Sequence, residues 1–117
     1  MVTVTSFEYQ PGGKWECAVL NFTAETPVGT VVWEEVVPGP RHGEDAASTT
    51  VTVGGKELHQ CDSRGSCVLD FPDFEAPNKE GRWAERFREE GLELVRERLE
   101  EWLSDEAVLA EVRRQLS

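Results

Sequence analysis

The alternation of apolar and polar residues changes along this chain and divides it into two parts. Residues 2–71 are rich in Val, Thr and aromatic side chains and are punctuated by Gly and Pro, a pattern typical of β-strands. Residues 79–116 are rich in Glu, Arg and Leu and contain no proline, which is typical of helices. Two prolines fall within residues 72–78, so we interpret that stretch as a linker between the two parts of one domain, residues 1–117.

Six segments of the first part are predicted to be strands. They are residues 2–9, 15–23, 28–37, 48–53, 56–61 and 66–71. Gly54 and Gly55 separate two of them and predict a two-residue hairpin, because both positions of such a turn favour a positive φ. The short connections favour an antiparallel meander.

The strand predicted at 15–23 has apolar residues on both faces. Trp15, Cys17 and Val19 lie on one face, and Leu20 and Phe22 lie on the other. This pattern predicts either a central strand covered on both sides or a bulge that exchanges the two faces.

A long helix is predicted over residues 79–103, with Asn78 as its N-cap. Its apolar stripe consists of Trp83, Phe87, Gly91, Leu94, Val95, Leu99 and Trp102. Ser104 and Asp105 predict a new cap, followed by a short amphipathic helix over 105–116. The expected fold is therefore α+β: an antiparallel meander sheet of five or six strands, with the long helix packed on one face and the short helix at its end.

The charge balance narrows the classes of partner. The 117 residues include 23 acidic and 12 basic side chains, a formal net charge of −11. Such a surface repels phosphates and anionic lipid, which argues against direct binding of nucleic acid or membranes. No apolar run reaches the roughly 18 residues of a membrane span, and the first residues lack an export-signal pattern. We therefore expect a soluble cytoplasmic protein.

The sequence lacks the common catalytic motifs. It has no Gly-rich phosphate loop, no HExxH, no CxxC and no Gly-x-Ser-x-Gly. The sequence therefore predicts a non-enzymatic protein without a cofactor or a metal.

The densest group of metal-ligand residue types is His59, Cys61 and Cys67, which Cys17 would complete as a Cys3His zinc shell. The spacing differs from known zinc knuckles, so we favour Cys17 and Cys67 as small buried apolar residues. A cross-strand disulfide between Cys61 and Cys67 remains open, as does a metal- or thiol-dependent enzyme that uses this cluster.

The predicted long helix carries a regular row of carboxylates, which we call the helix row. It consists of Glu85, Glu89, Glu93, Glu97 and Glu101, one residue every four. Like charges at this spacing cost a helix roughly 0.2–0.5 kcal/mol per pair. Steps of about 6 Å also resemble the spacing of phosphates along a nucleic acid, so the row is either a recognition face that mimics one or a solvated face laced with ion pairs.

Most of the excess charge lies before the helix. Residues 1–78 contain 12 acids and four bases, a net of −8, which leaves −3 for residues 79–117. A long turn-rich loop at 38–45 carries Arg41, His42 and Glu44, and we include these three residues among the candidate binding residues because such loops often bind partners.

These patterns lead to a functional hypothesis with two alternatives. The main hypothesis is a small acidic binding protein, such as an inhibitor, an immunity protein or a phage-encoded antagonist, that docks on a basic protein surface, including one that binds nucleic acid. The first alternative is a structural subunit of a homo-oligomeric, virion-like assembly in which residues 2–9 pair between copies. The second is the small enzyme built on His59, Cys61 and Cys67.

Overall fold

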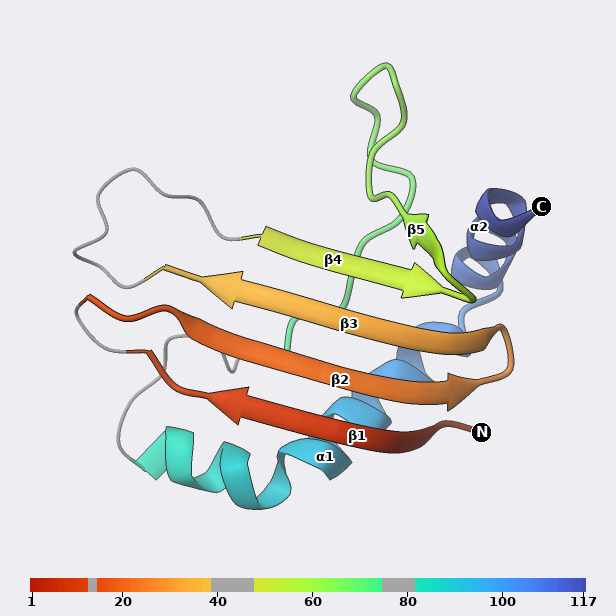
Figure 1. The fold of residues 1–117 in the computed structure, drawn as a ribbon. Coiled ribbons are helices and arrows are strands. Elements are labelled where there is room, and N and C mark those ends of the chain that lie inside the picture. Colours follow the sequence, from red (N-terminus) through yellow and green to blue (C-terminus); the bar gives the residue numbers. More distant parts are fainter. Residues whose placement is uncertain (13–14, 39–47, 75–81) are drawn as a thin grey trace.

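The chain folds into a five-stranded antiparallel meander followed by two helices, as the sequence predicts (Figure 1). The computed structural model describes residues 1–12, 15–38, 48–74 and 82–117, with side chains in the last range from Glu85 onward. The strands are β1 (Thr3–Gln10), β2 (Ala18–Thr26), β3 (Gly29–Val37), β4 (Ser48–Val53) and β5 (Lys56–Leu58). The helices are α1 (Arg82–Leu103) and α2 (Glu106–Leu116). The predicted cap at Asn78 and the side chain of Trp83 lie outside the described part.

The predicted glycine hairpin is confirmed. Val53 pairs with Lys56, so Gly54 and Gly55 form the whole turn between β4 and β5. Their φ angles are +58° and +83°, values that residues other than glycine rarely adopt. Two positive φ angles in succession match the twist of the flanking strands and fix the register of this pair.

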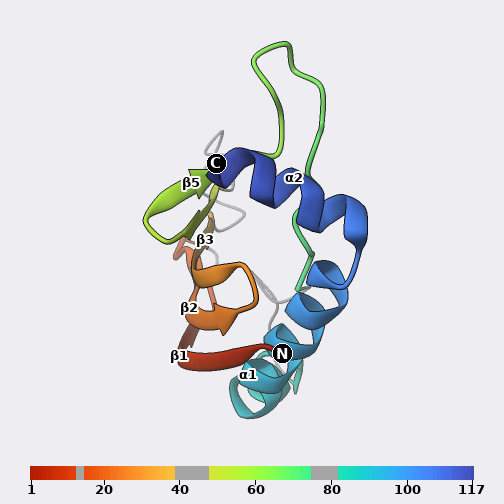
Figure 2. The ribbon, with the colours of Figure 1, turned by 90° about the vertical axis from the view of Figure 1, so that its right-hand side faces the viewer.

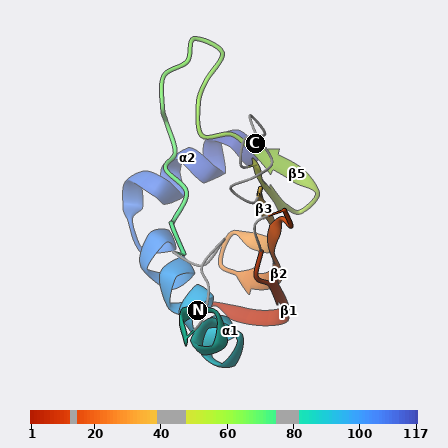
Figure 3. The same ribbon diagram turned by 90° about the vertical axis from the view of Figure 1, so that its left-hand side faces the viewer.

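The sequence predicts for residues 15–23 either a central strand covered on both sides or a bulge that exchanges its faces; β2 is central in the sheet, but no described element covers its second face and its pairing with β3 shows no bulge. Ala18, Leu20 and Phe22 are buried, whereas the strand begins only at Ala18, and Trp15 before it is 67% exposed. Among the described elements, both helices lie on one side of the sheet (Figures 2 and 3). The sheet therefore has an inner face that carries the core and an outer face that no described element covers. The bulge lies in β1, where the register shifts between Val4 and Ser6.

An aromatic cluster fills the centre of the inner face. The buried ring of Trp33 stacks on Phe22 with ring centroids 5.6 Å apart and meets Phe74 edge-on at 5.0 Å. Phe71 also contacts Trp33, at 5.5 Å. Phe74 is only 4% exposed although it lies in the predicted linker, so part of this linker belongs to the core.

Helix α1 covers the β1 side of the inner face. Phe87 is fully buried, and its ring lies 5.7 Å from that of Phe7 and 4.7 Å from that of Tyr9. Farther along the helix, Trp102 is half-buried and its indole N–H donates to the carbonyl of Asp70 at 2.7 Å. The apolar stripe of the predicted long helix therefore packs on the sheet, as expected.

Helix α2 begins at its predicted cap and turns away from α1 towards β5 (Figure 2). Asp105 accepts a hydrogen bond from the amide of Ala107 at 2.9 Å. At the other end, the Gln115 side chain exchanges two hydrogen bonds with the backbone of His59, at 2.8 and 2.9 Å. These bonds hold the last helix against the chain that leaves β5.

The strand predicted at residues 66–71, which the structure describes, does not form. Residues 66–71 contribute a single bridge, between Cys61 and Cys67, and the chain around it projects from the sheet as an arm (Figure 1). We call residues 60–69 the cysteine arm. Apart from this bridge, residues 60–69 are not paired with any strand of the sheet.

Candidate functional site: two acidic surfaces and a cysteine arm

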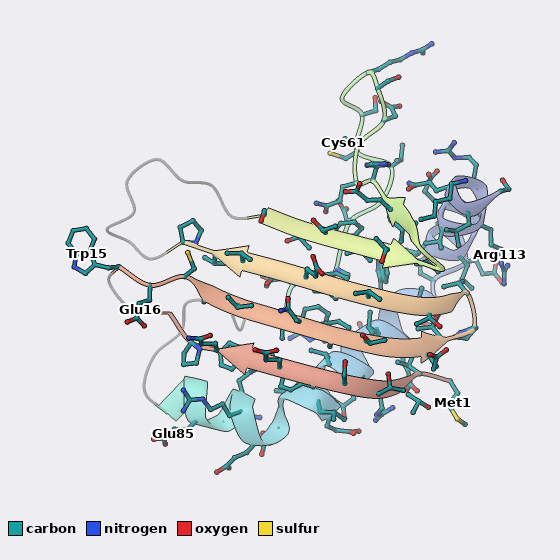
Figure 4. All side chains as sticks on the ribbon, in the orientation of Figure 1. Met1, Trp15, Glu16, Cys61, Glu85 and Arg113 are labelled. Atoms are coloured by element: carbon teal, nitrogen blue, oxygen red, sulfur yellow. The ribbon has the colours of Figure 1, made fainter. Side chains whose placement is uncertain are left out.

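The helix row is exposed along its whole length. Its five carboxylates all lie on the surface of α1, and Figure 4 shows Glu85 near the start of the helix, pointing away from the sheet. Arg96 forms ion pairs with Glu93 and with Glu100, and Arg86 pairs with Glu90. Glu93 is thus the one member of the row with an ion-pair partner among the described side chains.

These contacts shift ionisation in the expected direction. A hydrogen bond from Arg96 lowers the pKa of Glu93. The backbone N–H of Val2, followed by Arg96, lowers the pKa of Glu100 beside the row. Both carboxyl groups are therefore held in their charged form at neutral pH.

The geometry of an α-helix limits how much of the row one partner can touch. Four residues advance the helix by about 400°, so each step in the row turns it by about 40°. Between Glu85 and Glu101 the row winds through roughly 160°, which places its two ends on different sides of α1. A flat partner surface would meet the middle of the row, Glu89 to Glu97, and leave the ends uncontacted.

A second acidic surface lies on the outer face of the sheet, which we call the open sheet face. The strand register places Glu8, Glu25, Glu34 and Glu57 on it, among Thr, Ser, Asn and Val side chains. Among the described strand residues, this face carries no basic side chain. Its potential is therefore negative across the width of the sheet.

The centre of the open sheet face is slightly hollowed. Asn21 pairs with Glu8 on one side and with Glu34 on the other, so the two carboxylates flank an amide in one cross-strand row. A shallow depression of about 230 Å³ lies there, lined also by Ser6 and Thr23. Strands lie about 4.8 Å apart, which separates the backbones of Glu8 and Glu34 by about 10 Å.

Sequence reasoning missed this face as a site, although one signal pointed to it. The net charge of −8 over residues 1–78 indicates an acidic surface in the sheet part, but the sequence does not show which of its carboxylates lie together. Pairing register decides which carboxylates share a face, and register becomes known only once the strands are placed.

The adjacent pair Glu34 and Glu35 divides between the two faces, as strand alternation predicts. Glu35 points inward and is half-buried, and it accepts hydrogen bonds from the indole of Trp33 at 3.4 Å and from the hydroxyl of Thr49 at 3.3 Å. Burial raises the pKa of Glu35, and the two hydrogen bonds partly oppose that rise.

Three of the predicted binding residues, Arg41, His42 and Glu44, lie outside the described residues. Their role stays a prediction.

The cysteine arm brings together two of the predicted cluster residues and changes the prediction for a third. His59 and Cys61 line one open depression of about 690 Å³ at the base of the arm. The prediction that Cys67 is buried is wrong, because the arm projects from the sheet and exposes both Cys61 and Cys67. Cys17 is half-buried and precedes β2, at the end of the sheet where Trp15 projects (Figure 4).

The surroundings of Cys61 are unlike those of a catalytic thiolate. A hydrogen bond with Cys67, partial desolvation and the negative charges of Asp62 and Asp70 raise the pKa of Cys61. Catalytic cysteines lie in electropositive surroundings that have the opposite effect. Within the described residues, no group of three or more His, Cys, Asp or Glu side chains is placed to hold a metal ion.

Comparisons with known proteins add no relative. No family model, no curated protein and no solved structure matches this chain. Among the described helices, none is both long enough and apolar enough to cross a membrane.

Proposed function

We propose that this chain is a non-enzymatic acidic binding protein that docks on a basic protein surface, as an inhibitor, immunity protein or antagonist does. The observation that supports this most is the open sheet face, which carries carboxylates from four strands and no described basic side chain. Like charges gathered on one surface oppose folding, and a partner of opposite charge relieves that repulsion.

The partner is a protein with a basic patch. Electrostatic complementarity across such an interface steers association and suppresses wrong partners. A rigid five-stranded sheet presents its side chains in a fixed arrangement, which lowers the entropy lost on binding. The helix row is a second acidic surface for the same partner or for another part of it. If the partner binds nucleic acid, either acidic surface competes for the same basic groove.

The structural-subunit alternative depends on pairing between β1 strands. β1 is at the edge of the sheet, but the bulge between Val4 and Ser6 interrupts its register. Bulges of this kind are one of the devices by which edge strands avoid pairing with other chains. The strand geometry therefore favours the binding protein over the subunit.

The test compares three variants of equal charge change. Glu8→Gln with Glu34→Gln neutralises the centre of the open sheet face, and Glu89→Gln with Glu97→Gln neutralises the middle of the helix row. The control is Glu16→Gln with Glu106→Gln. It removes two exposed carboxylates that belong neither to the open sheet face nor to the helix row. Proteins captured by the parent chain from extracts at low salt are purified, and the Kd of each is measured for all variants at several salt concentrations.

The proposal expects a basic captured protein whose Kd rises with salt, because screening shortens to about 8 Å at physiological ionic strength. One of the two surface variants should weaken binding by about tenfold, equivalent to about 1.4 kcal/mol, while the control changes it little. Added DNA or RNA duplex should displace the chain if the bound groove is a nucleic-acid site. Unchanged affinity for both surface variants, or a partner without a basic patch, would refute the proposal.

A further inference from the structure

The backbone of the cysteine arm places Cys61 and Cys67 directly opposite each other. The amide of Asp62 donates to the carbonyl of Ser66 at 2.9 Å, and the amide of Val68 donates to the carbonyl of Gln60 at 2.7 Å. These two bonds flank the bridge between Cys61 and Cys67, which makes the cysteines a non-hydrogen-bonded antiparallel pair. In such pairs the Cα atoms lie about 4.5 Å apart, within the range of about 4.4–6.8 Å that disulfides span.

The turn that closes the arm holds this arrangement without help from the sulfur atoms. One carboxylate oxygen of Asp62 accepts hydrogen bonds from the amides of Arg64 and Ser66, at 2.8 and 3.0 Å. Gly65 adopts a φ of +83°, and its amide donates to the carbonyl of Asp62 at 3.0 Å. The thiols are thus pre-positioned by the backbone.

At the base, the arm is fixed to the core. The amides of Val68 and Leu69 both donate to the carbonyl of Gln60, and the Gln60 side chain accepts from the amide of Phe71 at 3.1 Å. Leu69 is buried. These bonds oppose a sliding of the two sides of the arm past each other. Such a movement would separate the cysteines.

The thiols themselves are close and accessible. The two Sγ atoms lie 3.4 Å apart in hydrogen-bond contact, and both residues are exposed. The open depression beside Cys61 gives a small molecule access to that sulfur. A bond of about 2.05 Å needs only a small further approach.

We propose that Cys61 and Cys67 form a reversible dithiol–disulfide site that exchanges with low-molecular-weight disulfides. One cysteine, as its thiolate, attacks a sulfur of the small disulfide and releases one small thiol, which leaves a mixed disulfide on the protein. The other cysteine then attacks the protein sulfur of that bond and releases the second small thiol. The protein dithiol is oxidised, the small disulfide is reduced to two thiols, and the two protons of the cysteines end on those thiols.

This site differs from a catalytic cysteine in what it does after the first attack. Because the second thiol lies beside the first, the mixed disulfide is short-lived and the product is the internal bond. Excess small thiol reverses the exchange. The fraction of protein with the Cys61–Cys67 disulfide therefore follows the ratio of small thiol to small disulfide around it.

The experiment uses the full chain with Cys17→Ser, so that only two thiols remain, and oxidised glutathione as the probe at pH 8. The parent pair should lose two hydrogen atoms by intact mass and retain no glutathione. In the same background, Cys61→Ser and Cys67→Ser should each retain one glutathione, because no second thiol resolves the adduct. Dithiothreitol should restore the starting mass in all three proteins.

Two outcomes would overturn the proposal. They are glutathione retained by the parent pair at the level seen in the single-serine variants, and disulfide-linked dimers as the main product.

A matched pair of variants tests the role of the turn. Asp62→Asn and Asp62→Ala remove the same negative charge, but only asparagine keeps an oxygen that can accept the amides of Arg64 and Ser66. The asparagine variant should form the internal disulfide severalfold faster than the alanine variant. Equal rates would show that the turn does not preset the two thiols.

Discussion

A glycine in the middle of α1 provides a sharp test of how the helix packs on the sheet. Gly91 is buried, and a methyl group added there would lie 2.5 Å from the ring tip of Phe7 and 3.1 Å from the ring of Phe87. Glycine inside a helix costs about 1 kcal/mol relative to alanine, so its presence needs a reason. The reason here is the ring of Phe7 on β1, which occupies the space that a Cβ would take.

Two opposing effects set the magnitude for Gly91→Ala. The helix gains about 1 kcal/mol in propensity, whereas overpacking a filled site costs about 1–3 kcal/mol. We expect the variant to be less stable than the parent, by up to about 2 kcal/mol. In a Phe7→Ala background only the 3.1 Å contact with Phe87 remains, and the same change should stabilise the protein by up to about 1 kcal/mol.

The assay is a double-mutant cycle by urea unfolding of the parent, both single variants and the double variant. The sign of the Gly91→Ala effect should reverse between the two backgrounds. A Gly91→Ala variant that is about 1 kcal/mol more stable than the parent with Phe7 present would refute the packing of α1 against β1.

Three further predictions concern the core, a buried carboxylate and a helix cap. Phe87→Ala should cost about 3–5 kcal/mol of unfolding free energy in urea, because its ring is fully buried; an unchanged midpoint would place the helix stripe against a partner instead. The raised pKa of Glu35 in the folded state means that its contribution to stability falls as pH rises from its unfolded towards its folded pKa. Glu35→Gln should therefore stabilise the protein at pH 7, and this advantage should disappear below about pH 4; an advantage that persists there would contradict the assignment. Asp105→Ala should cost about 0.5–2 kcal/mol through loss of the α2 cap, measured by thermal unfolding, and Asp105→Asn should retain most of it.

The elements that the sequence predicts well are those with a local cause. Gly54 and Gly55 determine their turn by backbone preference alone, and Asp105 caps α2 through a bond to its own neighbour. The stripe through Phe87 and Leu99 follows from helical periodicity, and both residues are buried. None of these depends on which distant segments meet.

The sequence-based predictions are wrong where contacts between distant segments determine the structure. The segment after Ser66 has the composition of a strand, but no described strand continues the sheet beyond β5, so only the bridge at Cys67 forms. Phe74 lies between two prolines. It is buried because its ring packs against that of Trp33, a contact that no local sequence pattern indicates. Trp15 is a large aromatic residue of the kind usually found in a core. It is exposed, and it lies outside the sheet because β2 begins three residues later.

The same distinction applies to the site. The spacing of the helix row predicted its exposure, because periodicity alone places those carboxylates opposite the apolar stripe. The open sheet face depends on how four strands are aligned, and such a tertiary relation has no signature in the spacing of residues. The pairing of Cys61 with Cys67 is local, because the two residues lie six positions apart across one turn, and the sequence already leaves a cross-strand disulfide between them open.

The order of the elements along the chain has a consequence for synthesis. Each strand of the meander pairs with its sequence neighbour, so the hairpins can form as the chain leaves the ribosome. The side chains that cover the β1 side of the inner face, Phe87 above all, are made later, as is Glu100, which binds the amide of Val2 at 3.1 Å. Until then Phe7 and Tyr9 face water on a nascent sheet, the kind of surface that aggregates. Helix α1 therefore covers these aromatic side chains only after the strands that carry them have been translated.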